Sequence, residues 1–263
     1  MNTTIQISFL ITHFNRPDDL KKCLQHIHAL GLPSYEIVVS DDCSTIKNQE
    51  VIKTMEIDKL LIAPENQGLA ANINKGIDAC RGEYIIYCQE DFILKAELKE
   101  ILPQCVDMIK SNTVDMIRFY SNVKFSKLIK ISNKIHLIPK FSLQNLHTNY
   151  YQYSDHPFII RKDFFILFGY YLENTSGDYG ETEYAIRMMR SKSKIGLLID
   201  NVTSNILGSN SVIDRVQTTK NNRFNGQKQI RRFARTLRLY FECLLYDKRK
   251  RGLRTYTNFR KLK

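Results

Sequence analysis

We predict that this sequence folds as an α/β protein, in which a mostly parallel, twisted sheet is flanked by helices. The first observation is that short runs of β-branched and aromatic residues alternate with segments of helical periodicity through about the first ninety residues. Such alternation is typical of strand–helix–strand units, which build parallel sheets. The second is that hydrophobic residues make up 43 % of the 263-residue chain, which is enough for a core on both faces of a sheet.

In the first part of the chain, residues typical of helix starts, helix ends and turns separate the expected elements. A strand at residues 5–12 precedes Pro17, Asp18 and Asp19, which favour a helix start because proline and acids suit the first turn. The apolar stripe that follows ends at Gly31, a typical helix stop. The remaining elements expected here are strands at 35–40, 59–63 and 83–88, a turn at 66–68, and a helix from 69 to about 80.

The pattern is less regular beyond residue 94. Residues 95–110 read as a helix in which Pro103 predicts a kink or a break. Residues 121–155 are polar and aromatic with hairpin-like pieces. The other expected elements are strands at 114–120, 157–160 and 195–199 and a helix at 184–190.

The C-terminal tail carries a charge of +13, slightly more than the net charge of +12 of the whole chain. Residues 220–263 hold 15 Lys and Arg against 2 Asp and Glu, so the rest of the chain is close to neutral. Within the tail, an apolar stripe at helical spacing lies beside several arginines and is followed by a basic run at 248–251; the stripe is Ile230, Phe233, Ala234, Leu237, Phe241, Leu244 and Leu245. A basic amphipathic helix of this kind favours contact with an anionic membrane surface through residues 227–263. Packing on the body or on a second subunit is the alternative.

Several classes of protein do not fit the sequence. No run of about 18 apolar residues predicts a membrane span, and residues 1–15 lack the basic region of a signal peptide, so we expect a cytoplasmic protein. The six cysteines show no CxxC pair, which favours reduced thiols over a zinc site. No nucleic-acid recognition motif accompanies the basic tail, and no GxGxxG follows the first strand, which excludes a dinucleotide-binding dehydrogenase.

Polar residues follow three of the predicted strands. They are Thr12 to Asn15, the pair Asp41-Asp42, and Gln89-Glu90-Asp91. Because ligands bind at the carboxyl ends of parallel strands, we expect these groups to share one edge of the sheet. Four carboxylates gathered there repel one another unless a cation or a polar ligand intervenes. A divalent metal with a phosphate ligand would relieve that repulsion.

Four segments in residues 5–94 carry a family resemblance: SFLITHFNRPDDLKKCL, YEIVVSDDCS, APENQGLAANINKGIDACRGEYIIY and CQEDFIL. In this order and spacing they resemble the inverting glycosyltransferases of family 2, which have the GT-A fold. The resemblance implies transfer of a sugar from a nucleotide-sugar, UDP by default, to a glycan or lipid-linked acceptor in bacterial surface polysaccharide or lipooligosaccharide synthesis. It divides the chain into a donor-binding half (1–94), an acceptor-binding and catalytic half (95–219) and the basic tail (220–263).

The resemblance also assigns site residues. It implies that Phe14 stacks on the base, that Asp42 contacts base or ribose, and that Arg81 faces the diphosphate. Asp91 would hold Mn²⁺ or Mg²⁺, although Gln89 stands where the family has its first aspartate, and His156 falls in the acceptor-side segment. The full set on the donor side is Thr12, Phe14, Asn15, Asp41, Asp42, Asn66, Gly68, Arg81, Gln89 and Glu90.

The family's second acidic motif corresponds to GETEYAIR at residues 180–187. Matching its arginine to Arg187 makes Glu181 the catalytic base, a shifted match makes it Glu183, and Asp178 is a third candidate. Nucleotidyltransferases, another class of enzyme with a nucleotide-binding sheet, carry a glycine-rich loop after the first strand, which ITHFNRPDD lacks. The non-enzymatic alternative is a degenerate relative that acts as a basic scaffold or binds nucleic acid.

Overall fold

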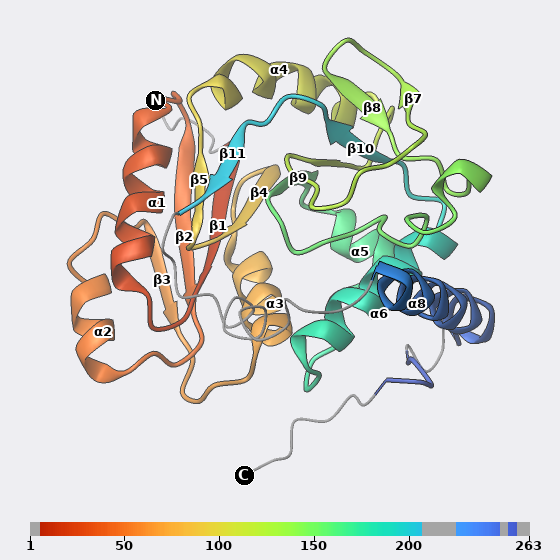
Figure 1. Cartoon of the computed structure of the whole chain (residues 1–263). Helices are drawn as coiled ribbons and strands as arrows, with labels where there is room; N and C mark the ends of the chain where they lie inside the picture. The colour runs from red at the N-terminus through yellow and green to blue at the C-terminus, as the bar shows by residue number, and fades with distance from the viewer. Residues whose placement is uncertain (1–5, 207–224, 248–251, 257–263) are drawn as a thin grey trace.

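The computed structural model describes residues 6–206, 225–247 and 252–256, and Figure 1 shows their arrangement. The centre is a nine-stranded sheet with the order β3-β2-β1-β4-β9-β6-β10-β8-β7. From edge to edge these strands are β3 (Lys59–Ile62), β2 (Tyr35–Asp41), β1 (Ile7–His13), β4 (Tyr84–Gln89), β9 (Phe158–Arg161), β6 (Met116–Arg118), β10 (Ile195–Leu198), β8 (Ile135–Leu137) and β7 (Ile129–Lys130). A small second sheet pairs β5 (Phe92–Leu94) with β11 (Thr203–Asn205).

Most strands of the large sheet run in one direction. β3, β2, β1 and β4 pair in parallel, and the antiparallel β9 links β4 to β6, which pairs in parallel with β10. The predicted α/β class and mostly parallel sheet are therefore confirmed. The strands of residues 1–94 and those of residues 95–219 form one continuous sheet because β4 and β9 join the two parts.

Helices cover both faces of the sheet. The helices are α1 (Pro17–Ala29), α2 (Ile46–Ile52), α3 (Leu69–Ala79), α4 (Glu97–Lys110), α5 (Phe164–Phe168) and α6 (Gly177–Arg190). One core packs α1 and α4 against a face that includes Phe9 and Ile11, and the other packs α3, α5 and α6 against a face that includes Leu10. Alternate residues of β1 thus point to opposite faces, as strand geometry requires.

Some boundaries differ from those that the sequence predicts. α4 continues through Pro103, so the predicted break is absent from this helix. The strand expected at 114–120 is shortened to β6. α6 begins at Gly177, seven residues before the predicted start, with Ser176 as its N-cap, and it therefore contains Glu181 and Glu183. The N-cap serine accepts a hydrogen bond from the backbone N–H of Tyr179, which fixes the start of the helix.

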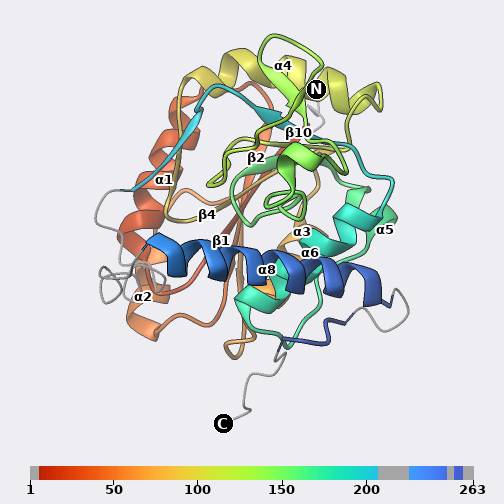
Figure 2. The same cartoon turned by 45° about the vertical axis from the view of Figure 1, so that its right-hand side comes forward.

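The predicted tail helix is present as α8 (Asn225–Leu245), which packs across α6 in Figure 2. Its buried residues are Thr236, Leu239 and Glu242, whereas the predicted apolar stripe faces outward. The stripe therefore does not pack on the body that residues 6–206 form. The basic run at 248–251 lies outside the described residues.

Candidate active site

The three polar segments that follow strands meet at the carboxyl edge of the sheet. β1 pairs with β2 up to His13 and Asp41, and with β4 up to Thr12 and Gln89. Backbone hydrogen bonds extend these pairs into the loops, from Asp42 N–H to the His13 carbonyl at 3.0 Å and from Glu90 N–H to the Thr12 carbonyl at 3.2 Å. The fold thus brings residues that are distant in the sequence to one edge.

Asp41 is a buried group that builds the loop around it. Its carboxylate accepts a hydrogen bond from Nδ1 of His13 at 2.7 Å and another from the Ser44 backbone N–H at 2.9 Å. Nε2 of His13 accepts the Arg16 N–H at 3.1 Å, so the ring proton lies on Nδ1 and is donated to Asp41. Burial alone would raise the pKa of Asp41, but the bonds from His13 and Ser44 outweigh it and hold that pKa below its usual range.

Asp42 shapes the turn that leads into α3. Its two carboxylate oxygens accept the backbone N–H groups of Gln67 and Gly68, both at 2.8 Å. Asn66 donates to the Asp42 carbonyl at 3.2 Å. Gly68 has φ 90°, a conformation that favours glycine, so the turn depends on this residue. The predicted contacts of Asp42, Asn66 and Gly68 with a nucleotide remain predictions.

The loop after β1 combines fixed and exposed side chains. Thr12 is buried, and its hydroxyl lies 3.2 Å from the Tyr87 hydroxyl. Asn15 accepts the Thr45 N–H at 2.8 Å, which ties this loop to the start of α2. Phe14 is 43 % exposed, so a face of its ring is accessible for stacking. Of these three side chains, Phe14 has the most surface to offer a ligand.

Asp91 has one paired and one unpaired carboxylate oxygen in the described part of the chain. Its Oδ2 lies 3.3 Å from Nη1 of Arg16, but its buried Oδ1 has no hydrogen-bond partner. Burial raises the pKa of Asp91, and it raises the pKa of the neighbouring Glu90 to about 7. Gln89 donates to the Asp155 carbonyl at 3.3 Å, so its amide is turned toward the other half of the site.

A divalent cation fits this set of ligands. Among the described residues no group of three or more His, Cys, Asp or Glu side chains is arranged to hold a metal. Mg²⁺ and Mn²⁺ are nevertheless commonly held by one or two carboxylates, with substrate phosphates and water completing the shell. The unpaired oxygen of Asp91, with Glu90 beside it, matches such a site.

Glu181 belongs to a second group of charges, contributed by β6, α6 and the segment before β9. It accepts a hydrogen bond from the Asp155 backbone N–H, and Arg118 and Arg235 favour its ionised form, although burial is the larger effect and raises its pKa. Burial and the charge of Glu181 raise the pKa of Asp155 to about 8. Asp155 is therefore mostly protonated at neutral pH, and Glu181, whose pKa is also raised, titrates together with it.

Glu183, the other candidate base, is held by contacts between α6 and the C-terminal segment. It is fully buried and forms an ion pair with Arg187 one turn later on α6. The hydroxyl of Tyr246, which follows α8, also donates to it. Both of its carboxylate oxygens accept hydrogen bonds at the contact between α6 and the C-terminal segment. The geometry therefore favours Glu181 over Glu183 as the base. Asp178, the third candidate, is exposed in the first turn of α6.

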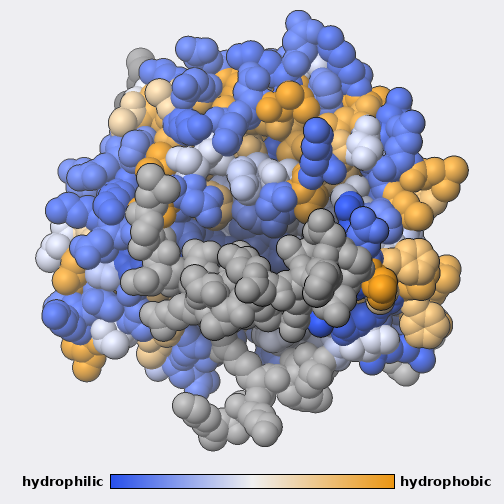
Figure 3. Space-filling model, viewed as in Figure 1, coloured by the Kyte–Doolittle hydropathy of each residue, from blue (hydrophilic) through white to orange (hydrophobic). Residues whose placement is uncertain are grey.

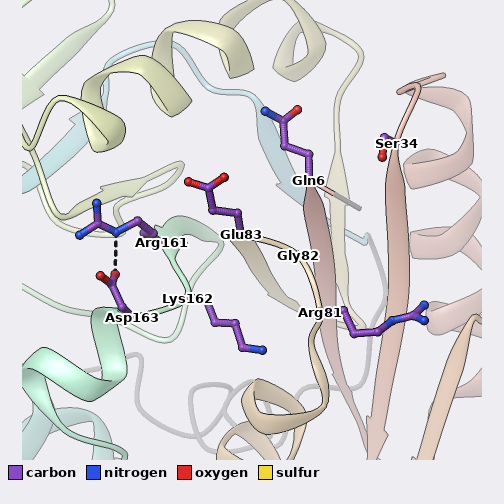
Figure 4. Close-up of a pocket in the computed structure, with 8 residues that line it drawn as sticks. All are labelled: Gln6, Ser34, Arg81, Gly82, Glu83, Arg161, Lys162 and Asp163. Atoms are coloured by element: carbon purple, nitrogen blue, oxygen red, sulfur yellow. Dashed lines mark hydrogen bonds and ion pairs between the residues drawn. The ribbon is translucent and has the colours of Figure 1, made fainter. Parts of the chain in front are cut away.

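The structure does not bring Arg81 to this site. Arg81 precedes β4, so it lies at the amino edge of the sheet, where its Nε donates to Glu36 at 2.8 Å. Figure 4 shows it in a hollow at the amino ends of β1, β2 and β4, beside Gln6, Ser34 and Glu83. The prediction that Arg81 faces the diphosphate is therefore wrong for this structure, because the length of β4 separates Arg81 from Asp91.

His156 lies between the two groups of charges. Its ring packs edge-on against Phe92 at 5.6 Å and lies 4.9 Å from the Tyr120 ring. Burial and the nearby charge of Arg118 lower the pKa of His156 to about 4, which keeps it neutral. Its contact with an acceptor remains a prediction.

Three charged residues of the site, Arg16, Asp155 and Arg118, are absent from the sequence-based set. Arg118 is fully buried and has no hydrogen-bond partner for Nε or Nη2; its Nη1 donates to the Tyr151 carbonyl at 2.7 Å. The arginine in the mostly apolar segment VDMIRFY could have indicated a site residue, because arginine is almost never fully buried in a strand unless it is paired. Arg16 follows Asn15 and Asp155 precedes His156, two residues that the family resemblance does assign. This neighbourhood is weaker evidence than a buried charge.

Comparison with known proteins identifies the family. The sequence profile described as Glycosyl transferase family 2 matches residues 8–168, more than half of the chain. EpsH of Bacillus subtilis (strain 168), a glycosyltransferase by name, is 31 % identical over 84 residues, which are 31 % of this chain and 24 % of EpsH. The protein therefore belongs to glycosyltransferase family 2, although the match spans about a quarter of the length of EpsH.

Solved structures of S. aureus TarS have a similar fold. The complex of TarS 1–349 with UDP-GlcNAc aligns with a TM-score of 0.57 and 16 % identity, covering 90 % of this chain and 73 % of that chain. A crystal structure of TarS aligns with a TM-score of 0.60 and 14 % identity, and the alignment covers 94 % of this chain and 45 % of that chain. The fold is thus that of a GT-A glycosyltransferase.

Proposed function

We propose that this protein transfers a sugar from a nucleotide-sugar, with a UDP-sugar as the first candidate, to a hydroxyl of a glycan or lipid-linked acceptor with inversion. The observation that carries the proposal is the unpaired, buried Oδ1 of Asp91 at the carboxyl edge of the sheet. In a family 2 chain, an unpaired carboxylate oxygen at the carboxyl ends of the strands supports this proposal, because carboxylates are the usual protein ligands of a cation that also binds a diphosphate. TarS, which shares the fold, has been solved with UDP-GlcNAc and with UDP.

The chemical step needs one base. Glu181 accepts the proton of the acceptor hydroxyl while that oxygen attacks the anomeric carbon, and the nucleoside diphosphate departs from the opposite face. Attack and departure on opposite faces invert the anomeric configuration. The proton on Asp155 limits the negative charge beside Glu181, and the cationic Arg118 offsets the charge of the ionised base.

Asp91, with Glu90 beside it, would hold the cation in this mechanism. When bound, Mn²⁺ or Mg²⁺ supplies Lewis-acid stabilisation of the departing diphosphate. Phe14 stacks on the base through its exposed ring, and the loop built by Asp41 and Asp42 keeps that residue and the 66–68 turn in place.

A donor screen tests the proposal. UDP-, GDP-, dTDP- and CMP-sugars are incubated with the protein and Mn²⁺, and the release of nucleotide and the shift in melting temperature are measured. We expect one nucleotide class to stabilise the protein and to be released slowly by hydrolysis. Stabilisation by DNA or RNA and by none of the donors would overturn the proposal in favour of a basic scaffold.

We further propose that α8 holds the enzyme at an anionic membrane surface, in keeping with a role in surface polysaccharide or lipooligosaccharide synthesis. Five apolar side chains of α8 are each more than half exposed and recur along one face: Ile230, Phe233, Leu237, Phe241 and Leu244. Figure 3 shows hydrophobic side chains gathered over this helix at the edge of the molecule. None of the helices in the described part of the chain is long and apolar enough to cross a membrane, so contact would be with the surface.

The double variant Phe233→Glu with Leu237→Glu is expected to lose more than tenfold in affinity for vesicles containing phosphatidylglycerol. Each apolar side chain inserted into lipid contributes about 1.5–3 kcal/mol, and the added charges oppose insertion. Co-sedimentation with vesicles measures this loss. The control is Ile166→Glu with Leu167→Glu, two exposed apolar residues of α5. An equal loss in the control, or equal binding of the wild type to uncharged vesicles, would contradict the proposal.

A further inference from the structure

A hollow next to Glu181 has three arginines among its eight described lining residues. It has a volume of about 550 Å³ and lies between the first turns of α6 and one side of α8. From α6 come Asp178 and Glu181, and from α8 come Arg231, Arg235 and Arg238. The spacing of the three arginines, four and then three residues, places them in one row along the helix.

The row lies beside the outward apolar stripe of α8, and Ala234 of that stripe also lines the hollow. On a helix at a protein surface the charged residues usually face solvent and the apolar ones face the body. In α8 the apolar stripe faces outward, whereas Arg231, Arg235 and Arg238 line the hollow that contains the proposed base. These charges are therefore directed toward the site where an acceptor hydroxyl has to lie.

The described residues offset the charge of this row in part, because Glu181 interacts with Arg235 and the Arg235 guanidinium carbon lies 5.8 Å from the centre of the Tyr151 ring. Neither Arg231 nor Arg235 forms an ion pair with a carboxylate of the described part of the chain. Arg238 is held in place by Thr255, whose hydroxyl accepts from its Nε at 2.8 Å, and by the Tyr256 ring, 3.7 Å from its guanidinium carbon. With two carboxylates and three guanidinium groups, the hollow has an excess of positive charge.

The hollow is poorly suited to an uncharged sugar. Proteins commonly bind neutral sugars by stacking them on an exposed aromatic face, and Tyr256 is the one aromatic side chain among the described lining residues. Arg238 covers a face of that ring. Guanidinium groups instead form charge-assisted, often bidentate hydrogen bonds with phosphate and carboxylate.

We propose that the acceptor carries a phosphate or carboxylate group near its reacting hydroxyl, and that Arg231 and Arg235 bind this group beside Glu181. The inference rests on the proposed function, because it takes Glu181 as the base. The negative group would enter along α8 and pair with the arginine row, which positions a neighbouring hydroxyl over the carboxylate. Arg238, already held by Thr255 and Tyr256, adds positive charge at a fixed place.

The test compares charged and uncharged probes of the same size by isothermal titration calorimetry. The probes are glycerol 3-phosphate with glycerol, and glucuronate with glucose. The variant is Arg231→Gln with Arg235→Gln, both exposed residues, and the charge-matched control is Arg232→Gln with Lys192→Gln, also exposed and outside the hollow. UDP affinity and melting temperature are measured for each protein.

For the wild type we expect at least one charged probe to bind about tenfold more tightly than its neutral counterpart. The variant Arg231→Gln with Arg235→Gln should lose this preference, and the control variant should keep it. The pair that shows the preference identifies the oxyanion. Equal affinity for charged and neutral probes, or equal loss in the control, would overturn the inference. The inference would also be overturned if the variant Arg231→Gln with Arg235→Gln lost binding to phosphatidylglycerol vesicles but bound the soluble probes as the wild type does. Failure of the wild type to bind any nucleotide would instead refute the proposed function.

Discussion

Replacing Glu181 with glutamine is expected to lower the rate of sugar transfer by about 10²–10⁴-fold and to leave nucleotide binding unchanged. The size follows from the usual contribution of a positioned base to proton transfer. Glutamine keeps the shape of the side chain and its hydrogen bond from the Asp155 backbone N–H, but it has no basic oxygen. Initial rates at saturating donor, with the donor Kd measured separately, distinguish the two effects.

Neighbouring carboxylates provide the controls for this result. Asp155→Asn should retain most of the activity at pH 7, because the raised pKa of Asp155, about 8, already keeps this group protonated. Asp178→Asn should lower the rate far less than the Glu181 change does, because Asp178 is exposed and acts on Glu181 only through its charge. Transfer that survives in the Glu181 variant and is lost in the Asp155 variant would reverse the two roles. The wild-type rate should rise with pH as Glu181 loses its proton, at a higher pH than for an exposed glutamate, since burial raises its pKa.

Glu183→Gln should give a different kind of loss. Removing one partner of a buried ion pair costs about 3–5 kcal/mol because the other charge stays buried, so this variant should melt at a markedly lower temperature. Its remaining folded fraction should transfer sugar at a rate close to that of the wild type. A stable Glu183 variant without activity would return the role of the base to Glu183.

The Asp91→Asn variant is expected to lose about 10²-fold or more in transfer and to lose its response to Mn²⁺. Asparagine is the same size, but it removes the negative charge that would hold the cation, and a cation supplies several kcal/mol of stabilisation to the departing diphosphate. Without metal, the variant should be at least as stable as the wild type, because the Asp91 carboxylate is buried with one oxygen unpaired.

Titration of Mn²⁺ in the presence of UDP, followed by melting temperature, measures this effect without catalysis. The wild type should gain stability with Mn²⁺ and UDP together, and the Asp91 variant should not. Asp18→Asn, which removes an exposed acid from the first turn of α1, is the charge-matched control. The assignment of Asp91 would be refuted by an Asp91 variant that responds to Mn²⁺ as the wild type does.

The carboxyl edge of the sheet was predictable from the sequence because parallel strands impose it. Strands that end at Thr12, Asp41 and Gln89 had to place their following residues together. The same rule places Arg81, which precedes β4, at the opposite edge; its assignment by resemblance alone was therefore wrong. The chain itself relieves part of the repulsion expected among the four carboxylates, through His13, backbone N–H groups and the raised pKa of Glu90. Asp91 keeps a buried oxygen without a hydrogen-bond partner in the described residues.

The second half of the site depends on long-range packing that periodicity does not report. Asp155 lies in an irregular segment, and it meets Glu181 only because β9 inserts between β4 and β6. The stripe on α8 was predictable, but the face that contacts the body was not, because Thr236 and Glu242 are buried there by specific hydrogen bonds. A hydrophobic pattern identifies an amphipathic helix without determining which side faces the protein.

The most direct test of the whole arrangement is a crystal structure with UDP and Mn²⁺, with the metal located by its anomalous signal. We expect one strong anomalous peak bonded to a carboxylate oxygen of Asp91 and to the diphosphate, with the uracil against Phe14 and Glu181 facing the sugar side of the complex. A peak at another place in the protein, or UDP bound away from the carboxyl edge of β1, β2 and β4, would contradict the proposed site.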